Sequence, residues 1–296
     1  SVLSLPARAG RTNARCGSQF RNANNLSGSL LVIISDTHIG GSTALATPEY
    51  TVHNRYDLEA QTIHANRLQS WLWECWSDFW SYVKELQGKG KHARRLIVVH
   101  CGDVIDGVHN GSTQLMPEIG DQMQLALDIL QPIAGRANAF FGIYGTGAHA
   151  GNENVYESQL YTELGAQAYG HQLTLDIDGY LHSFQHHGRS GGRPWTSSAA
   201  GLAAEVMLDY AQRGQKPPNF IWTGHTHRCD DSGMKFQETR AISLPSWQLK
   251  SSFSWKVAGN SVRSDIGGAI VLDGHIIDGS RLRYMGQADE RSTIKV

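Results

Sequence analysis

Several features that would classify a protein at once are scarce in this chain of 296 residues. No segment approaches the roughly 18 consecutive apolar residues that a membrane helix needs, so we expect no integral membrane protein. Four cysteines lie far apart with no Cys-x-x-Cys pair, which argues against a structural zinc knuckle and against a disulfide framework. A net charge of -1 and a pI near 6.9 provide no general basic field for nucleic acid or membranes. We therefore expect a cytoplasmic protein.

The first 29 residues contain four arginines and no acid, and the first acidic residue is Asp36. This composition is similar to that of an organelle transit peptide, but it is also typical of a disordered basic tail, which we favour. We expect residues 1–28 to form that tail and residues 29–296 to form one domain, because no boundary or repeat interrupts the rest.

Apolar and β-branched runs predict seven strands, and amphipathic patterns between them predict helices. The predicted strands are 30–34, 96–99, 139–144, 173–177, 180–185, 219–223 and 268–273. The predicted helices are 56–87, 119–131, 154–164 and 196–213. Strands that alternate with helices predict a layered α/β architecture.

Histidine is abundant, with 14 residues, and it is the side chain best suited to bind transition metals near neutral pH. Five of the predicted strands are followed directly by polar motifs: DTHIG, CGDVIDG, GTGAH, HHG and GHTHR. Ligands of open α/β sheets bind at the carboxyl ends of the strands. The five motifs therefore predict one site with aspartate and histidine donors.

Taken in order, Asp36-x-His38, Gly102-Asp103-x-x-Asp106, His187-Gly188 and Gly224-His225-x-His227 resemble the motifs of the calcineurin-like metallophosphoesterase superfamily. The resemblance extends over residues 30 to about 228. It implies a four-layer αββα sandwich around a binuclear metal centre.

The resemblance also implies a ligand set. Asp36, His38 and His227 would hold one metal, His225 and a histidine of the HHG motif would hold the other, and Asp103 would bridge both. We prefer His187 over His186, because the family often places its ligand just before glycine, whereas strand alternation leaves His186 open. Mixed nitrogen and oxygen donors suit two divalent transition-metal ions, Mn, Fe, Zn or Ni, better than Mg.

One motif departs from the family pattern. Where members read Gly-Asn-His-[Asp/Glu], this chain reads Gly145-Thr146-Gly147-Ala148-His149, which resembles a variant of phage-type members. Thr146 replaces a ligating asparagine, and Asn152, water or His149 itself are alternatives for the missing ligand. We favour His149 as a general acid, with Asp106 as the residue that orients it.

Two further readings concern neighbouring segments. Arg189 and Arg193 are candidates to bind substrate phosphate, with a solvated loop as the equal alternative. Asn152 and Asn154 are candidate helix caps, with Glu157 at the spacing of a capping box after Asn154.

The implied activity is that of a metal-dependent phosphoesterase, a phosphatase or phosphodiesterase, which hydrolyses phosphate esters with a metal-bridging hydroxide. The alternatives are a nuclease-like enzyme, which the net charge does not favour, and a non-catalytic scaffold of the same fold, which the intact motifs do not favour. The sequence makes no prediction of oligomeric state or of the natural substrate.

Overall fold

The computed structural model describes residues 28–53, 59–108, 114–188, 198–233, 236, 238–251, 264–277 and 284. The predicted tail lies outside these residues apart from Gly28, as do Arg189 and Arg193. The strands of the two main sheets are β1 (Ser29–Ile34), β4 (Arg95–His100), β5 (Ala139–Ile143), β6 (Ala168–Gly170), β7 (Gln172–Ile177), β8 (Tyr180–Gln185), β9 (Phe220–Thr223), β10 (Asp230–Asp231), β11 (Arg240–Ser243), β12 (Ala269–Leu272) and β13 (His275–Ile276).

The first sheet has six strands in the order β13-β12-β1-β4-β5-β6, and β1, β4, β5 and β6 run parallel. Both faces of its central strands are buried, so their sequences are continuous apolar runs. Within β1, Leu30 and Val32 face one core, whereas Leu31 and Ile33 face another. The alternation of side chains along a strand thus serves two cores at once.

The second sheet has five strands in the order β10-β11-β9-β8-β7, with β8, β9 and β11 parallel. Its inner face supplies Phe184, Phe220 and Trp222 to the core that also contains Leu31 and Ile33 of the first sheet. The two sheets therefore pack face to face.

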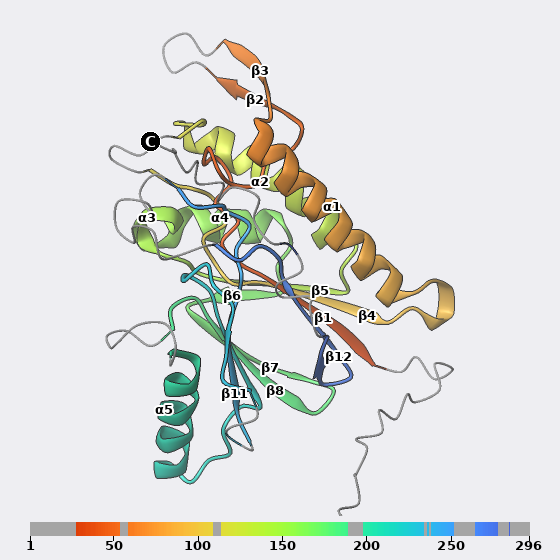
Figure 1. Ribbon diagram of the computed structural model, residues 1–296, viewed down its shortest axis with the longest axis vertical. Helices are drawn as coiled ribbons and strands as arrows, with labels where there is room; N and C mark the ends of the chain where they lie inside the picture. Colours follow the sequence, from red (N-terminus) through yellow and green to blue (C-terminus); the bar gives the residue numbers. More distant parts are fainter. Residues whose placement is uncertain are drawn as a thin grey trace, which may run out of the picture.

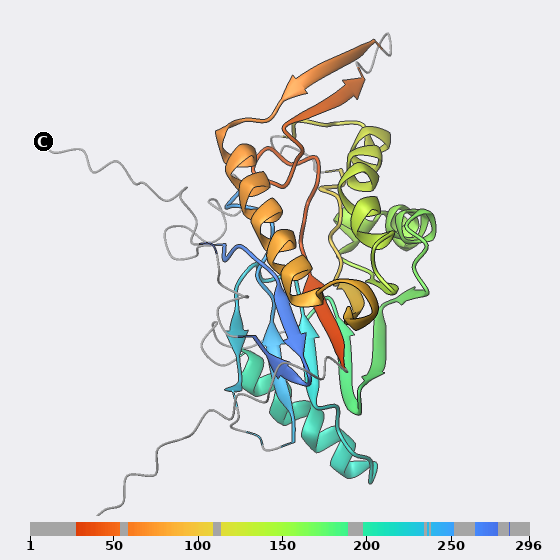
Figure 2. The same ribbon diagram turned by 90° about the vertical axis from the view of Figure 1, so that its right-hand side faces the viewer.

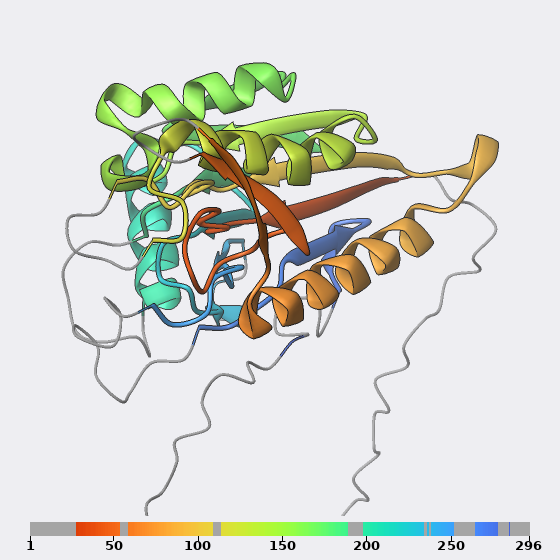
Figure 3. The ribbon, with the colours of Figure 1, turned by 90° about the horizontal axis from the view of Figure 1, so that it is seen from above.

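Helices cover both outer faces (Figure 1). On the first sheet lie α1 (Arg67–Gln87), α2 (Ile119–Ala134) and α4 (Val155–Glu163), and on the second lies α5 (Ser198–Gln212), which packs Leu202 and Ala203 against Ile221 and Ala241. This arrangement is the expected four-layer αββα sandwich, and Figure 3 shows α1, α2 and α4 along the outside of the first sheet. No helix in the described part of the chain has the length and hydrophobicity that a bilayer crossing requires.

The prediction of one helix over 56–87 is wrong in its first part. Helix α1 begins after Asn66, whose side chain accepts hydrogen bonds from the Leu68 and Gln69 amides in a capping box. Before it, β2 (Glu49–His53) and β3 (Ala60–His64) form an antiparallel hairpin that projects beyond α1 and α2 (Figure 2). Three short elements remain among the described residues: the 3-10 helices η1 (Gly90–His92) and η2 (Asn152–Asn154) and the one-turn helix α3 (Gly147–Ala150).

Candidate metal centre

The carboxyl ends of β1, β4, β5, β8 and β9 bring the predicted polar residues together, as the sequence argument requires. Groups of three donor atoms within 4.8 Å of one another occur four times among the described residues. Together these groups contain the following eight side chains: Asp36, His38, Asp103, His149, His186, His187, His225 and His227.

The backbone at these strand ends is unusual. A positive φ is uncommon for residues other than glycine and costs free energy, so clusters of such residues point to sites where geometry is imposed by function. Nine such residues occur in the described part of the chain, and five are candidate ligands: Asp36 (53°), His38 (44°), Asp103 (54°), His225 (70°) and His227 (54°). Strands β1, β4 and β9 therefore each end in a sharp turn that carries candidate ligands into the centre.

The first candidate position consists of Asp36, His38 and His227. The Nε2 atoms of the two histidines lie 3.0 Å apart, and that of His227 lies 3.4 Å from Oδ1 of Asp36. Burial alone would raise the pKa of Asp36, but the hydrogen bonds of His227 and His38 hold it well below its usual value. Burial lowers the pKa of His38 to about 4, which favours the neutral imidazole that ligates metals. Two ring nitrogens and a carboxylate that point at one another are a donor set that fits a cation.

Asp103 lies between the two positions and is almost fully buried. Its Oδ2 atom is 3.0 Å from Nε2 of His186 and 3.8 Å from Nε2 of His38. Burial opposes ionisation of Asp103, but the charge and hydrogen bond of His186 hold its pKa well below the usual value. Asp103 is thus an ionised carboxylate that contacts a member of each position.

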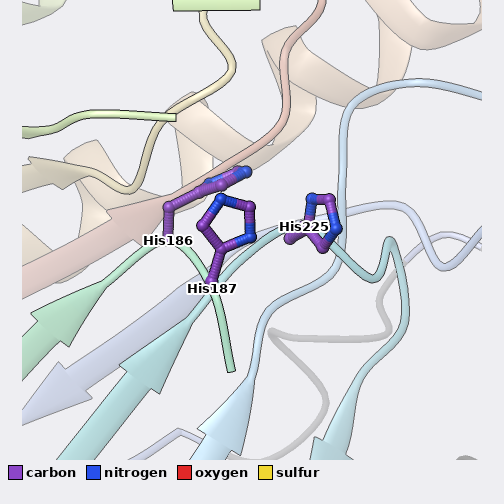
Figure 4. A group of neighbouring side chains, drawn as sticks. All are labelled: His186, His187 and His225. Atoms are coloured by element: carbon purple, nitrogen blue, oxygen red, sulfur yellow. The ribbon is translucent and has the colours of Figure 1, made fainter. Parts of the chain in front are cut away.

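The second candidate position consists of His186, His187 and His225, which approach one another from the ends of β8 and β9 (Figure 4). His186 is buried, and its Nδ1 atom donates to the Cys101 carbonyl at 2.7 Å, which leaves Nε2 as the atom facing Asp103. His187 and His225 are exposed. The structure therefore brings both residues of the HHG pair to the centre, and His186 is the one in contact with Asp103.

The histidines of the second position differ in the direction of their pKa shifts. Burial alone would lower the pKa of His186, but the charge of Asp103 raises it to about 10. Burial and the neighbouring His186 lower the pKa of His225. His186 would have to lose its proton to ligate a metal, since the ligating form of imidazole is the neutral one.

Thr146 lies within this second position. Its Oγ1 atom is 3.3 Å from Oδ2 of Asp103, 3.3 Å from Nδ1 of His225 and 3.4 Å from Nε2 of His186. The hydroxyl group therefore contacts all three candidate ligands.

His149, on α3, lies at the other side of Asp103. Its ring stands edge-on to His38 at 4.4 Å between centroids, and its Nε2 atom is 3.9 Å from Oδ2 of Asp103. The Nδ1 atom donates to the backbone carbonyl of Asp106 at 2.7 Å, so Nε2 faces the centre. The carboxylate of Asp106 accepts a hydrogen bond from Gln114 at 2.8 Å. Any residue at position 106 would offer the same backbone carbonyl to His149. This contact therefore does not explain why position 106 is an aspartate.

Sequence reasoning missed the role of Glu157, which it assigned to a capping box. Asn154 makes no side-chain cap. Glu157 is instead fully buried beneath the centre and accepts hydrogen bonds from the amides of Val104 and Gly145. Burial and then the charge of Asp103 raise its pKa to about 8, whereas the two amides favour the carboxylate. A glutamate on the buried face of a predicted helix was the available signal.

Comparison with known proteins gives distant likenesses only. No family model matches the chain, and no curated protein matches it in sequence. Among solved structures, it is similar to an archaeal phosphodiesterase, with 13% identity over 82% of this chain and 92% of that chain and a TM-score of 0.39. It is also similar to a predicted phosphoesterase of Streptococcus pneumoniae, with 12% identity, 83% of each chain covered and a TM-score of 0.32.

A third similar structure is zinc-bound Vps29 of Entamoeba histolytica, with 16% identity over 51% of this chain and 73% of that chain and a TM-score of 0.29. At these identities and TM-scores the matches are too distant to assign an activity.

Proposed function

We propose that this chain is a binuclear metal-dependent hydrolase of phosphate mono- or diesters, of the calcineurin-like metallophosphoesterase superfamily. The observation that carries the proposal is the convergence of two donor groups on one buried carboxylate, Asp103, at the carboxyl ends of parallel strands. Groups of this kind recur at sites that hold two metal ions about 3.5–4 Å apart.

The donors divide between the two positions in the way that the sequence motifs suggest. Asp36, His38 and His227 would hold the first ion. His225 and a histidine of the HHG pair would hold the second, and here contact with Asp103 supports His186 rather than His187. Asp103 would bridge both ions. Imidazole nitrogens mixed with carboxylate oxygens support Mn, Fe, Zn or Ni over Mg.

Two divalent ions held there would polarise a phosphoryl oxygen and lower the pKa of a water molecule that attacks phosphorus in line. The protein groups have different tasks. Asp36 and Asp103 supply fixed negative charge, and the second position faces solvent through His187 and His225, where a phosphate ester can enter.

We assign His149 to protonation of the leaving group. Its Nδ1 atom is held by the Asp106 carbonyl, its Nε2 atom points toward the centre, and its side chain is 13% exposed, so a bound ester can reach it. A proton placed on Nε2 would pass to the departing alkoxide oxygen. Arg189 and Arg193, which lie outside the described residues, remain candidates to bind the phosphate of the substrate.

The test measures metal content and hydrolysis on the same purified protein. We expect about two transition-metal ions per chain by elemental analysis and hydrolysis of a chromogenic phosphodiester. A chelator should inactivate the protein reversibly, and Mn²⁺ should restore more activity than Mg²⁺.

Each other outcome has a definite meaning. Full activity in excess chelator would exclude metal catalysis. Two bound ions without hydrolysis of any phosphate ester would indicate a binding scaffold, and a preference for polynucleotides over small esters would indicate a nuclease.

A further inference from the structure

The side chain of Glu157 links two of the loops that carry candidate ligands. Its Oε1 atom accepts from the amide of Val104 at 3.1 Å, and its Oε2 atom accepts from the amide of Gly145 at 2.6 Å. Glu157 belongs to α4 and is fully buried. One carboxyl group thus satisfies two backbone donors that have no partner in a strand or helix.

These two loops carry the groups that meet in the second position. Val104 follows Asp103, and Gly145 precedes Thr146, whose amide donates to Oδ1 of Asp103 at 2.6 Å. The approach is so close that a Cβ atom at Gly145 would lie 2.1 Å from that same oxygen. A small change in the separation of the loops would therefore alter the contact of Asp103 with Thr146.

A third ligand loop is joined to the same network. Thr37, between Asp36 and His38, donates from Oγ1 to the carbonyl of Val104 at 2.7 Å. The Nε2 atom of buried His100 lies 3.1 Å from this hydroxyl, which has its proton engaged and so accepts. The hydrogen bonds of Glu157 thus hold the loops of Asp103 and Thr146 directly, and the loop of Thr37 through Val104.

We propose that Glu157 is a positioning residue of the metal centre, whose two carboxyl oxygens fix the spacing of the Asp103 and Thr146 loops and so set the affinity of the second metal position. This inference rests on the proposed function, because it requires that the centre holds metal. Residues behind metal ligands typically contribute 10- to 100-fold to metal affinity.

The chemistry of the contact selects the test. Two N–H donors require two acceptors, and Glu157→Gln keeps the size of the side chain but replaces one acceptor with an NH₂ group that faces an amide. Glu157→Asp keeps both acceptors on a side chain one methylene shorter. It serves as the second variant if Glu157→Gln does not fold.

Two control variants on the same helix separate positioning from stability. Leu160 is fully buried one turn further along α4, so Leu160→Ala destabilises the fold by a cavity and removes no hydrogen bond to a ligand loop. Ser158→Ala removes a hydrogen bond from Ser158 to the Tyr144 hydroxyl, next to Glu157.

The experiment measures Mn²⁺ affinity in two steps by chelator competition, together with the melting temperature of each metal-free protein. We expect Glu157→Gln to bind the weaker ion about 10- to 100-fold less tightly, while both controls bind it like wild type. Wild-type affinity in Glu157→Gln would overturn the inference, as would an equal loss in a Leu160→Ala protein of similar melting temperature. A wild-type protein without bound metal would instead refute the proposed function.

Discussion

The two candidate metal positions differ in burial and in the source of their charge. The first has a buried carboxylate of its own, Asp36, beside buried His38. The second has only histidines besides the shared Asp103, and two of them, His187 and His225, are exposed. The hydroxyl of Thr146 lies 3.3 Å from Nδ1 of His225 in this second position.

This difference separates two requirements of the proposed chemistry. A buried carboxylate binds a cation strongly because little solvent competes for either, whereas a position with two exposed imidazoles and no carboxylate of its own binds more weakly but leaves room for substrate. We therefore expect the first position to hold its ion more tightly, and the second to exchange its ion and receive the ester.

The largest effect is expected from Asp103→Asn, which should weaken both positions. The substitution removes the negative charge that lies 3.0 Å from His186 and 3.8 Å from His38, so turnover should fall to background and both ions should be lost. Elemental analysis and a phosphodiester assay measure this. Asp121→Asn is the control, since Asp121 is a buried carboxylate that contacts His53. Wild-type activity with two ions in Asp103→Asn would refute the bridging role.

The second prediction compares adjacent residues of the second position. His186→Ala should weaken the second ion by more than the roughly 100-fold typical of residues behind the ligands, because His186 contacts Asp103 directly. His187→Ala should weaken it only a few-fold, since His187 is exposed. A two-step Mn²⁺ titration of each variant measures the affinity for the second ion. The reverse order would support the sequence-based preference for His187.

The third prediction asks whether His149 belongs to either position. If His149 is a general acid, His149→Ala should lower kcat for alkyl phosphate esters by about 100- to 10,000-fold. The loss should be much smaller for p-nitrophenyl esters, whose leaving group needs little protonation. Metal content should not change. His171→Ala, at an exposed histidine near Asn154, is the control. Equal losses for both esters with weaker metal binding would make His149 a ligand instead.

The fourth prediction replaces Thr146, whose hydroxyl lies in the second position, by one residue that should bind the metal more tightly and by one that should bind it less tightly. An amide oxygen is a better metal ligand than a neutral hydroxyl, so Thr146→Asn should tighten the weaker ion by about 10-fold, a magnitude in the range of single-group effects on metal sites. Thr146→Val keeps the shape of the side chain without the hydroxyl and should weaken the binding of the same ion. If neither variant changes the Mn²⁺ affinity, Thr146 does not contribute to the site.

The last prediction concerns a buried histidine outside both positions. His182 lies in the core between the sheets, where Trp222 donates to its Nδ1 atom at 3.1 Å, and burial lowers its pKa from 6.5 to about 4. Below pH 6.5 the unfolded chain binds a proton that the folded chain excludes. The stabilising contribution is therefore full above pH 6.5 and is lost as the pH falls toward 4, by about 3 kcal/mol in all.

His182→Asn tests this, because its amide oxygen can accept from Trp222 without titrating. Guanidinium unfolding of the metal-free proteins at pH 4.5 and 7 should show a smaller loss of stability in the variant. An identical pH dependence in both proteins would contradict the shift. The site carboxylates titrate in both proteins alike and cancel in this difference.

The fold was largely predictable because its central strands are buried on both faces. The seven predicted strands correspond to β1, β4, β5, β7, β8, β9 and β12 within one or two residues at each end. The hairpin of β2 and β3 was missed, since its pairing is short and one contact that holds it, from His53 to Asp121 on α2, joins residues distant in sequence. Periodicity alone does not reveal such contacts.

The candidate site was predictable in membership but not in detail. Motif order indicated which side chains would meet at the strand ends. The relation of His186 to His187 depends on the turn after β8, which directs His186 toward Asp103 and leaves His187 at the surface. Glu157 was missed because its partners are backbone amides, which form no motif, although its place on the buried face of a predicted helix was a signal.

The left-handed backbone at five candidate ligands limits which residues these positions can accept. Asparagine, aspartate and histidine are the residues other than glycine that adopt positive φ most readily, and they are also short donors of oxygen or nitrogen. Glutamate and cysteine can also ligate metals, but they lack this backbone preference. Substitutions that keep both the turn and a donor are therefore most favourable among asparagine, aspartate and histidine at these five positions: Asp36, His38, Asp103, His225 and His227. Homologues that change metal preference should do so by exchange among these three residues.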